Sequence, residues 1–385
     1  MPAVPACLSN QGRHPGDADR RSDDRALRIL LVRLRLIGDV VFTTPLIRAL
    51  RRAYPAARIT YVVEPDAAPV VAHNPHLDEV IIAPRTRGAR RIADDVALAR
   101  RLRRARFDLA LDLHGGPRSA WLTWASGATE RVGYDIKGRA WMYTRVVRRA
   151  RDLRPRHSVV NQWDLLEAIP GWPGDAADQT RDRVEMALDP TADARMAARL
   201  AAAGVTPAEE LVVLHVSAGN PFRRWPDVFF AETAAALAGG NARRRLAFSS
   251  GPSDREAAAR IAADTRARLG NAAGRIIDLG EFDLQELRAL IGRSRLFVGG
   301  DPGPLHIAAA TATPIVGIYG PTLAARSAPW RPASIPTFSV ETAVADLPCR
   351  PCDQRTCVPG DFRCLTQLTP GKVIAAAEQA LMGGM

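Results

Sequence analysis

Short apolar runs recur along this chain, and longer amphipathic stretches separate them. The first runs cover residues 28–34, 59–63, 79–83 and 108–113, and a very basic amphipathic stretch, 89–106, precedes the last of them. Apolar runs of this length bounded by turn residues are typical of buried strands, and the periodicity between them is typical of helices. Because strands and helices alternate, we expect a parallel, doubly wound α/β sheet.

The same alternation begins again near residue 210, which predicts a second sheet of similar size. We therefore expect two Rossmann-like domains, 27–190 and 205–385, that face each other across a cleft and bind ligands at the carboxyl ends of their strands. Residues 1–26 mix Pro, Gly, Asp and Arg without periodicity, which predicts a disordered leader. The strands expected in the second domain are 211–216, 246–250, 276–279, 296–298 and 314–318.

Charge and composition narrow the class of partner. The formal net charge of +12 favours phosphorylated or membrane-surface partners. We expect no nucleic acid, because the chain has no zinc-finger spacing, no RNA-binding aromatic motif and no basic stripe interleaved with aromatic residues. No stretch is long and apolar enough for a membrane span or a secretory signal, so a cytoplasmic location is expected.

Four of the five cysteines form the pattern C-x2-C-x4-C-x6-C at Cys349, Cys352, Cys357 and Cys364. This spacing permits a small structural metal site, reduced thiols or a disulfide-stapled loop, and the pattern alone does not decide among them. It is not a standard zinc-finger spacing. We assign these cysteines no catalytic role.

The stretch 296–322 carries the clearest candidate chemistry. An apolar run meets Gly299, Gly300 and Asp301, a helix-compatible segment follows, and a second apolar run ends in Gly-Pro-Thr. Glycines permit a sharp turn at the end of a strand, and the N-terminus of a helix attracts anions such as a diphosphate. The same residues could instead serve only to turn the chain and cap the helix.

Asp39 follows the first predicted strand, in the stretch 33–46 (RLRLIGDVVFTTPL). From its position alone, the carboxylate either caps the next helix or faces the interdomain cleft, and capping is the commoner role of such a residue.

Residues 301–306 (DPGPLH), the following Ala-rich segment and the Gly-Pro-Thr at 320–322 resemble the nucleotide-sugar signature of the ADP-heptose:lipopolysaccharide heptosyltransferases, glycosyltransferase family 9. The stretch 33–46 is similar to the N-terminal motif of the same family. The resemblance implies the GT-B arrangement of two Rossmann-like domains and transfer with inversion. It also implies that Asp39 is the base that activates the acceptor hydroxyl, with Gly38 permitting close approach of the acceptor.

The resemblance implies donor-binding residues in three loops. In 215–226 (HVSAGNPFRRWP), Ser217 and Arg223 occupy the family's positions for the donor diphosphate, with Arg224 as an alternative cation. In 248–256 (FSSGPSDRE), either Asp254 or Glu256 would meet the ribose, although both also suit the first turn of a helix. In the last loop, Asp301, Gly303 and His306 would contact the sugar and the phosphates. Pro302 departs from the family's usual Thr or Ser.

The function implied by the resemblance is transfer of a heptose from ADP-L-glycero-D-manno-heptose to a lipopolysaccharide core acceptor. No metal or other cofactor is expected to be required, because basic side chains and helix N-termini would stabilise the departing ADP. The expected partners are the nucleotide-sugar donor and a lipid-linked oligosaccharide acceptor, and an anionic inner-membrane surface could hold the protein peripherally. The alternatives are transfer from another nucleotide sugar and non-catalytic binding of a sugar nucleotide.

Overall fold

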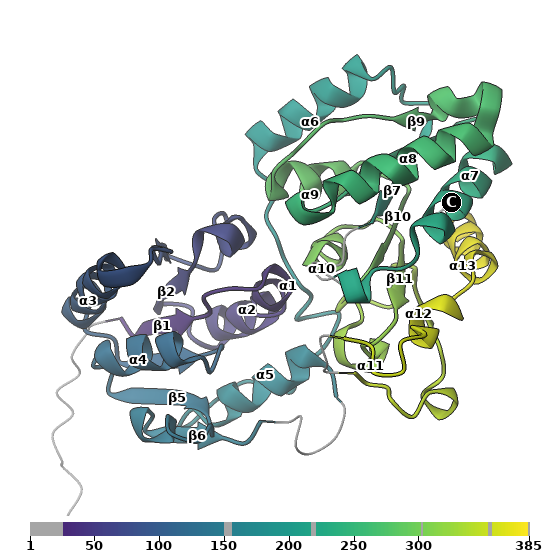
Figure 1. Ribbon diagram of the computed structural model, residues 1–385. Helices are drawn as coiled ribbons and strands as arrows, with labels where there is room; N and C mark the ends of the chain where they lie inside the picture. The colour runs from purple at the N-terminus through teal and green to yellow at the C-terminus, as the bar shows by residue number, and fades with distance from the viewer. Residues whose placement is uncertain (1–25, 150–155, 217–220, 302, 353–355, 384–385) are drawn as a thin grey trace, which may run out of the picture.

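The computed structural model describes residues 26–149, 156–216, 221–301, 303–352 and 356–383. They form two α/β halves, each built on a six-stranded parallel sheet with helices on its faces (Figure 1). The predicted leader at residues 1–26 lies almost entirely outside the described residues. No helix in the described part of the chain is long and apolar enough to cross a bilayer.

The first half has the strand order β3-β2-β1-β4-β5-β6. Its central strand β1 is buried from Ile29 to Val32, as expected for a strand covered by helices on both faces. Its elements are β1 (Arg28–Val32), α1 (Ile37–Val41), α2 (Thr44–Ala53), β2 (Arg58–Val63), η1 (Pro65–Val70), β3 (Glu79–Ile82), α3 (Gly88–Arg104), β4 (Leu109–Asp112), α4 (Pro117–Ala125), β5 (Glu130–Tyr134), η2 (Ala140–Met142), β6 (Arg145–Val147) and α5 (Ser158–Glu167).

The second half repeats this topology with the strand order β12-β11-β10-β7-β8-β9. Its elements are α6 (Pro190–Ala202), β7 (Glu210–His215), η4 (Pro221–Arg223), α7 (Asp227–Gly240), β8 (Arg244–Ser249), η5 (Pro252–Asp254), α8 (Arg255–Leu269), η6 (Gly270–Arg275), β9 (Ile276–Ile277), α9 (Leu284–Gly292), β10 (Leu296–Gly300), α10 (Gly303–Ala309), β11 (Ile315–Tyr319), α11 (Ala324–Ser327), β12 (Thr337–Glu341), η7 (Val344–Asp346), α12 (Arg363–Thr366) and α13 (Pro370–Met382).

The apolar runs found in the sequence all coincide with strands, whereas three further strands were not predicted. Strands β5, β6 and β12 carry charged or polar residues and are short, so they lack the continuous apolar run of a central strand. The stretch between the two expected domains, 190–204, contains helix α6, which packs against α9 of the second half.

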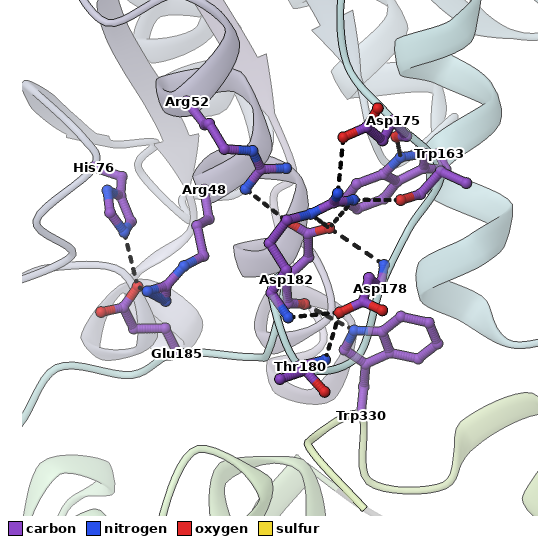
Figure 2. Close-up of polar contacts among 12 residues, drawn as sticks. Arg48, Arg52, His76, Trp163, Asp175, Asp178, Thr180, Asp182, Glu185 and Trp330 are labelled. Carbon is purple, nitrogen blue, oxygen red and sulfur yellow. Dashed lines mark hydrogen bonds and ion pairs between the residues drawn. The ribbon is translucent and has the colours of Figure 1, made fainter.

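A connecting segment links the halves and is held by both of them. Asp182 is fully buried, and its carboxylate lies 2.8 Å from Nη1 of Arg52 on α2. Its backbone carbonyl accepts a hydrogen bond of 2.8 Å from Nε1 of Trp330 in the second half. Nearby, Glu185 lies 3.2 Å from His76 and 3.6 Å from Arg48 (Figure 2). These contacts fix the connection against α2.

The two halves also pack directly against each other where α1 contacts α10. A single hydrophobic cluster contains Val41 and Phe42 from the first half and Leu305 and Ile307 from the second. The side chain of Gln285 adds a hydrogen bond of 2.8 Å from Nε2 to the carbonyl of Pro69. The interface between the halves is therefore an extension of the protein's core.

Candidate active site

A cavity opens in the first half where the strand order reverses between β1 and β4. Doubly wound sheets bind ligands at this point, beyond the carboxyl ends of the strands. The cavity has a volume of about 230 Å³ and is lined by Arg33, Asp39, Leu113, Tyr134, Arg149, Ser158, Asn161 and Gln162. Arg149 lies 5.2 Å above the ring of Tyr134 and donates to the carbonyl of His114, which fixes this wall.

Asp39 lies in the first turn of α1 without capping it. Helix α1 has no side-chain cap, and the residue in the N-cap position is Leu36, whose φ of 71° is uncommon for a residue other than glycine. One oxygen of Asp39, Oδ2, accepts a hydrogen bond from Nη2 of Arg33. The carboxylate is 38% exposed and faces the cavity, so it remains accessible to a ligand.

In the second half, the corresponding reversal of strand order lies between β7 and β10. The segments after these strands contain the predicted donor-binding residues except Asp254 and Glu256, which follow β8. Asp301 follows β10, accepts a hydrogen bond of 3.1 Å from Ser327, and places Oδ1 3.3 Å from Nε2 of His306. His306 is almost fully buried, and its Nδ1 has no hydrogen-bond partner among the described residues. Ser217 lies outside the described residues.

Two glycines allow the helices α1 and α10 to meet. A Cβ atom placed on Gly38 would lie 2.5 Å from the ring of His306, and one on Gly303 would lie 2.8 Å from Ile37. Phe42 also packs on His306, with ring centroids 4.2 Å apart. Gly38 therefore permits contact between the two halves, whereas the sequence suggested close approach of an acceptor. This contact brings Asp39 and the loop 301–306 to one interface.

The two adjacent arginines of the second half have different surroundings. Arg224 donates to Asp254 at 2.7 Å and to Asp227 at 3.1 Å. Arg223 forms no hydrogen bond or ion pair with any residue that the structure describes. Asp254 is 3% exposed, whereas Glu256 is exposed on the first turn of α8. Of the two arginines, Arg223 is therefore the one available to bind a ligand. The two acidic residues differ in that Asp254 is buried and Glu256 is exposed.

A further cavity of about 390 Å³ lies at the carboxyl ends of β8 and β9. Neither Asp254 nor Glu256 lines it. Its polar wall includes Ser249, Ser250, Arg255, Asp278 and Glu281, and Phe248 and Phe282 supply apolar surface. The structure therefore does not place the two predicted ribose-binding carboxylates in the neighbouring cavity.

The profile of glycosyltransferase family 9 (heptosyltransferase) matches residues 96–361, which is more than half of the chain. The chain belongs to this family. The protein is thus a glycosyltransferase. The matched range includes Arg223, Asp301 and His306 but begins after Asp39.

Relatives of known function extend the similarity over most of the sequence. Lipopolysaccharide heptosyltransferase 1 of Pseudomonas aeruginosa is 27% identical over 381 residues, which cover 92% of this chain and 98% of the relative. Lipopolysaccharide heptosyltransferase 3 of Escherichia coli is 27% identical over 75% of this chain and 82% of its own length.

Solved structures of family members share the fold. A family 9 glycosyltransferase of Veillonella parvula has a TM-score of 0.76 at 23% identity, covering 92% of this chain and 97% of its own. The ADP-heptose lipopolysaccharide heptosyltransferase II of E. coli has a TM-score of 0.73 at 20% identity and covers 92% of this chain and 99% of its own. The predicted fold class, α/β of the GT-B type with two Rossmann-like halves, is confirmed.

Two residues near the site, Arg33 and His157, were not predicted from the sequence. Arg33 was not singled out, although a cation six residues before Asp39 at the end of a strand is a signal that could have been used. His157 packs between Phe42 and Trp330, with ring centroids 5.1 and 4.8 Å away, and contacts Ala328 O at 2.8 Å. No sequence signal indicated it, because its partners lie in distant segments.

The four clustered cysteines all line one cavity of about 280 Å³ beside Phe222 and Pro321. All four are free thiols, and burial together with the neighbouring thiols raises the pKa of Cys364 to about 11. The described residues contain no group of three or more His, Cys, Asp or Glu arranged to hold a metal ion. The residues 353–355 between the second and third cysteine lie outside the described part.

Proposed function

We propose that this glycosyltransferase moves a heptose from ADP-L-glycero-D-manno-heptose to a lipopolysaccharide core acceptor, with inversion at the anomeric carbon. The relatives named lipopolysaccharide heptosyltransferases support the donor and the acceptor class. One structural observation carries the proposal. The carboxyl-end loops of both sheets meet at the α1–α10 contact, which brings the candidate base Asp39 toward the candidate donor loop 301–306.

In the proposed reaction, Asp39 takes the proton from the acceptor hydroxyl. Its Oδ2 is engaged by Arg33, so Oδ1 is the oxygen free to accept the proton. The acceptor oxygen then bonds to the anomeric carbon from the face opposite the donor phosphate. The bond between that carbon and the phosphate oxygen breaks, and ADP leaves with the electron pair.

The departing ADP would be stabilised from the second half. Arg223 supplies a positive charge that no described residue neutralises, and Gly303 offers its N–H at the start of α10. Ser217 would contribute a hydroxyl, as the family resemblance implies. These groups support a reaction that requires no metal cofactor. Turnover that survives exhaustive treatment with EDTA would support this part of the proposal, and restoration by added divalent cation would contradict it.

The acceptor half is strongly cationic, which suits an acceptor that carries negative charge. Arg33 and Arg149 line the cavity next to Asp39. Burial, together with Arg33, Arg35 and Arg149, lowers the pKa of His114 to about 4, so this histidine stays neutral at physiological pH. A lipid-linked oligosaccharide bearing acidic groups fits this environment. We propose that the reaction takes place at the cytoplasmic face of the inner membrane, with the protein attached peripherally.

One other function is retained as an alternative, because the cavity at β8 and β9 does not identify the nucleoside. The glycosyltransferase could use another nucleotide sugar as its donor. Incubation with a panel of nucleotide sugars and extracted lipid acceptors, with free nucleotide as the readout, separates the two functions. Acceptor-dependent release of ADP from ADP-heptose alone supports the proposal. Release only from another donor would replace the proposal with the alternative, and release from no donor would contradict both.

A further inference from the structure

Two tryptophans are exposed side by side on the outer surface of the first half. Trp124 on α4 is 43% exposed and Trp141 on η2 is 64% exposed. Their ring centroids lie 5.7 Å apart in an edge-to-face arrangement, and Nε1 of Trp141 donates to the carbonyl of Gly138. Large aromatic side chains are usually mostly buried in a globular protein, so an exposed pair marks a surface for interaction.

Helix α3, which packs beside α4, carries exposed positive charge. Helices α3 and α4 pack together, and the guanidinium of Arg103 lies against Gly127, just beyond α4. Arg100, Arg103 and Arg104 are exposed and form no ion pair with any residue that the structure describes. By contrast, Arg101 on the same helix is paired with Glu79 at 2.8 Å. The charge of these three arginines on α3, beside α4, is therefore not neutralised by any described residue.

We name this surface the Trp–Arg face and define it by Trp124, Trp141, Arg100, Arg103 and Arg104. Helices α3 and α4 lie on the side of the first half that is remote from the second half (Figure 1). The second half thus leaves α3 and α4 uncovered, and both helices belong to the half that carries Asp39.

The Trp–Arg face is also connected to the candidate acceptor cavity. Helix α4 begins at Pro117, directly after the loop that follows β4. Arg139 donates to the carbonyl of Gly115 in that loop, and Arg149, which lines the cavity, donates to the carbonyl of His114. A partner bound at the Trp–Arg face would therefore lie next to the half that is proposed to receive the acceptor.

We propose that the Trp–Arg face docks the protein on an anionic lipid bilayer. Tryptophan side chains favour the headgroup region of a membrane, because the indole has both an apolar ring and a polar N–H group. Unpaired arginines are attracted to anionic lipid headgroups within a Debye length of the surface. The proposal deepens the membrane attachment named under the proposed function by assigning the residues that make it, and it needs no knowledge of the donor.

The test uses the full-length protein and sedimentation with vesicles. We expect binding to vesicles that contain phosphatidylglycerol, little binding to pure phosphatidylcholine, and loss of binding at high salt. The variants Trp124→Ser/Trp141→Ser and Arg100→Glu/Arg104→Glu should each weaken binding by roughly tenfold or more. The indole fluorescence of the wild type should shift to shorter wavelength on binding, and the shift should be smaller in the tryptophan variant.

Matched controls separate the face from general charge and hydrophobicity. Arg243→Glu/Lys372→Glu on the second half changes the net charge by the same amount as the arginine variant, and Val228→Ser/Met382→Ser removes exposed apolar side chains there. Both controls should bind vesicles as the wild type does. Equal losses in the controls, or wild-type binding by both face variants, would overturn the proposal. Face variants that lose binding to duplex DNA but bind vesicles as the wild type does would also overturn the proposal.

Failure of this proposal is distinguishable from failure of the proposed function. Transfer to a delipidated, water-soluble acceptor should proceed at the wild-type rate in both face variants, because the altered residues do not line the active-site cavity. Circular dichroism and thermal unfolding identify any variant that has failed to fold. A folded variant with normal soluble-acceptor activity and undiminished vesicle binding counts against the docking face alone.

Discussion

At the scale of single residues, the structure distinguishes side chains that the sequence could only group together. Asp39 is paired with Arg33 and does not cap its helix. Capping is therefore excluded as its role, and the proposal that it acts as a base stands. Arg223 and Arg224 are adjacent in the sequence, but only Arg224 is engaged by carboxylates within the described residues. Each distinction leads to a testable prediction.

The first prediction concerns Asp39→Asn, which keeps the size of the side chain and removes its ability to take a proton. Turnover should fall by about 10²- to 10⁴-fold, the usual contribution of positioned proton transfer. ADP affinity, measured by calorimetry, and thermal stability should remain near those of the wild type, because the proposed donor contacts lie in the second half. Turnover within a few-fold of wild type would return Asp39 to a structural role.

The second prediction compares Arg223→Ala with Arg224→Ala. Arg223→Ala should weaken ADP binding by about tenfold or more with little change in stability, because only a ligand contact is lost. Arg224→Ala should lower the free energy of unfolding by roughly 2 kcal/mol or more, because it removes a partner from the buried carboxylate of Asp254. Calorimetry with ADP and urea unfolding measure the two effects. The opposite pattern would exchange the proposed roles of the arginines.

At the scale of elements, the contact between α1 and α10 is the feature that assembles the site. These helices are short, and neither could bring its residues to the other without the close approach allowed by Gly38 and Gly303. Because α1 follows β1 and α10 follows β10, this single contact aligns the switch points of both sheets. A small change here should affect catalysis more than folding.

The third prediction is that Gly38→Ala lowers kcat by about 10- to 100-fold, because a displacement of about 1 Å between reacting groups can have an effect of this size. The added Cβ would lie 2.5 Å from the ring of His306, so the helices must separate. Gly239→Ala in α7 is the matched control, since apart from its chain neighbours and the adjacent backbone of its own helix nothing lies within 4 Å of its added Cβ. Its kcat should be unchanged. Equal kinetics for the two variants would show that the contact tolerates separation.

At the scale of the whole molecule, two histidines with a lowered pKa should make the stability of the protein depend on pH. Burial lowers the pKa of both His157 and His215 to about 4. His157 lies between the two halves, where it contacts Ala328 O, and His215 lies at the end of β7, where Nδ1 contacts Ser249. The unfolded chain therefore binds protons at a higher pH than the folded protein does.

The fourth prediction follows from the sign of these shifts. Stability that is present above pH 6.5 should be lost as the pH falls toward 4, by up to about 3 kcal/mol for each of these two histidines. Urea unfolding at a series of pH values measures this loss. The variant His157→Gln, which can still donate to Ala328 O, should lose less stability than the wild type over the same range. An identical pH dependence would show that His157 does not contribute.

The sequence by itself determined the central strands, the fold class and the loops that carry the candidate residues. Continuous apolar runs between amphipathic stretches are a local signal, and the motifs at 33–46 and 301–306 stand at the ends of such runs. Asp39, Arg223, Asp301 and His306 could therefore be named without coordinates, although their roles remain predictions.

Only the tertiary structure decided which of these residues meet. The strands β5, β6 and β12, of which only β6 and β12 lie at sheet edges, depend on neighbouring strands more than on their own composition. The pairing of Arg33 with Asp39, the pairing of Arg224 with Asp254, and the position of Gly38 against His306 all depend on how separate elements pack. A local sequence pattern specifies the strand or helix on which a residue lies. Which charge it faces is set by contacts between segments that are distant in the chain.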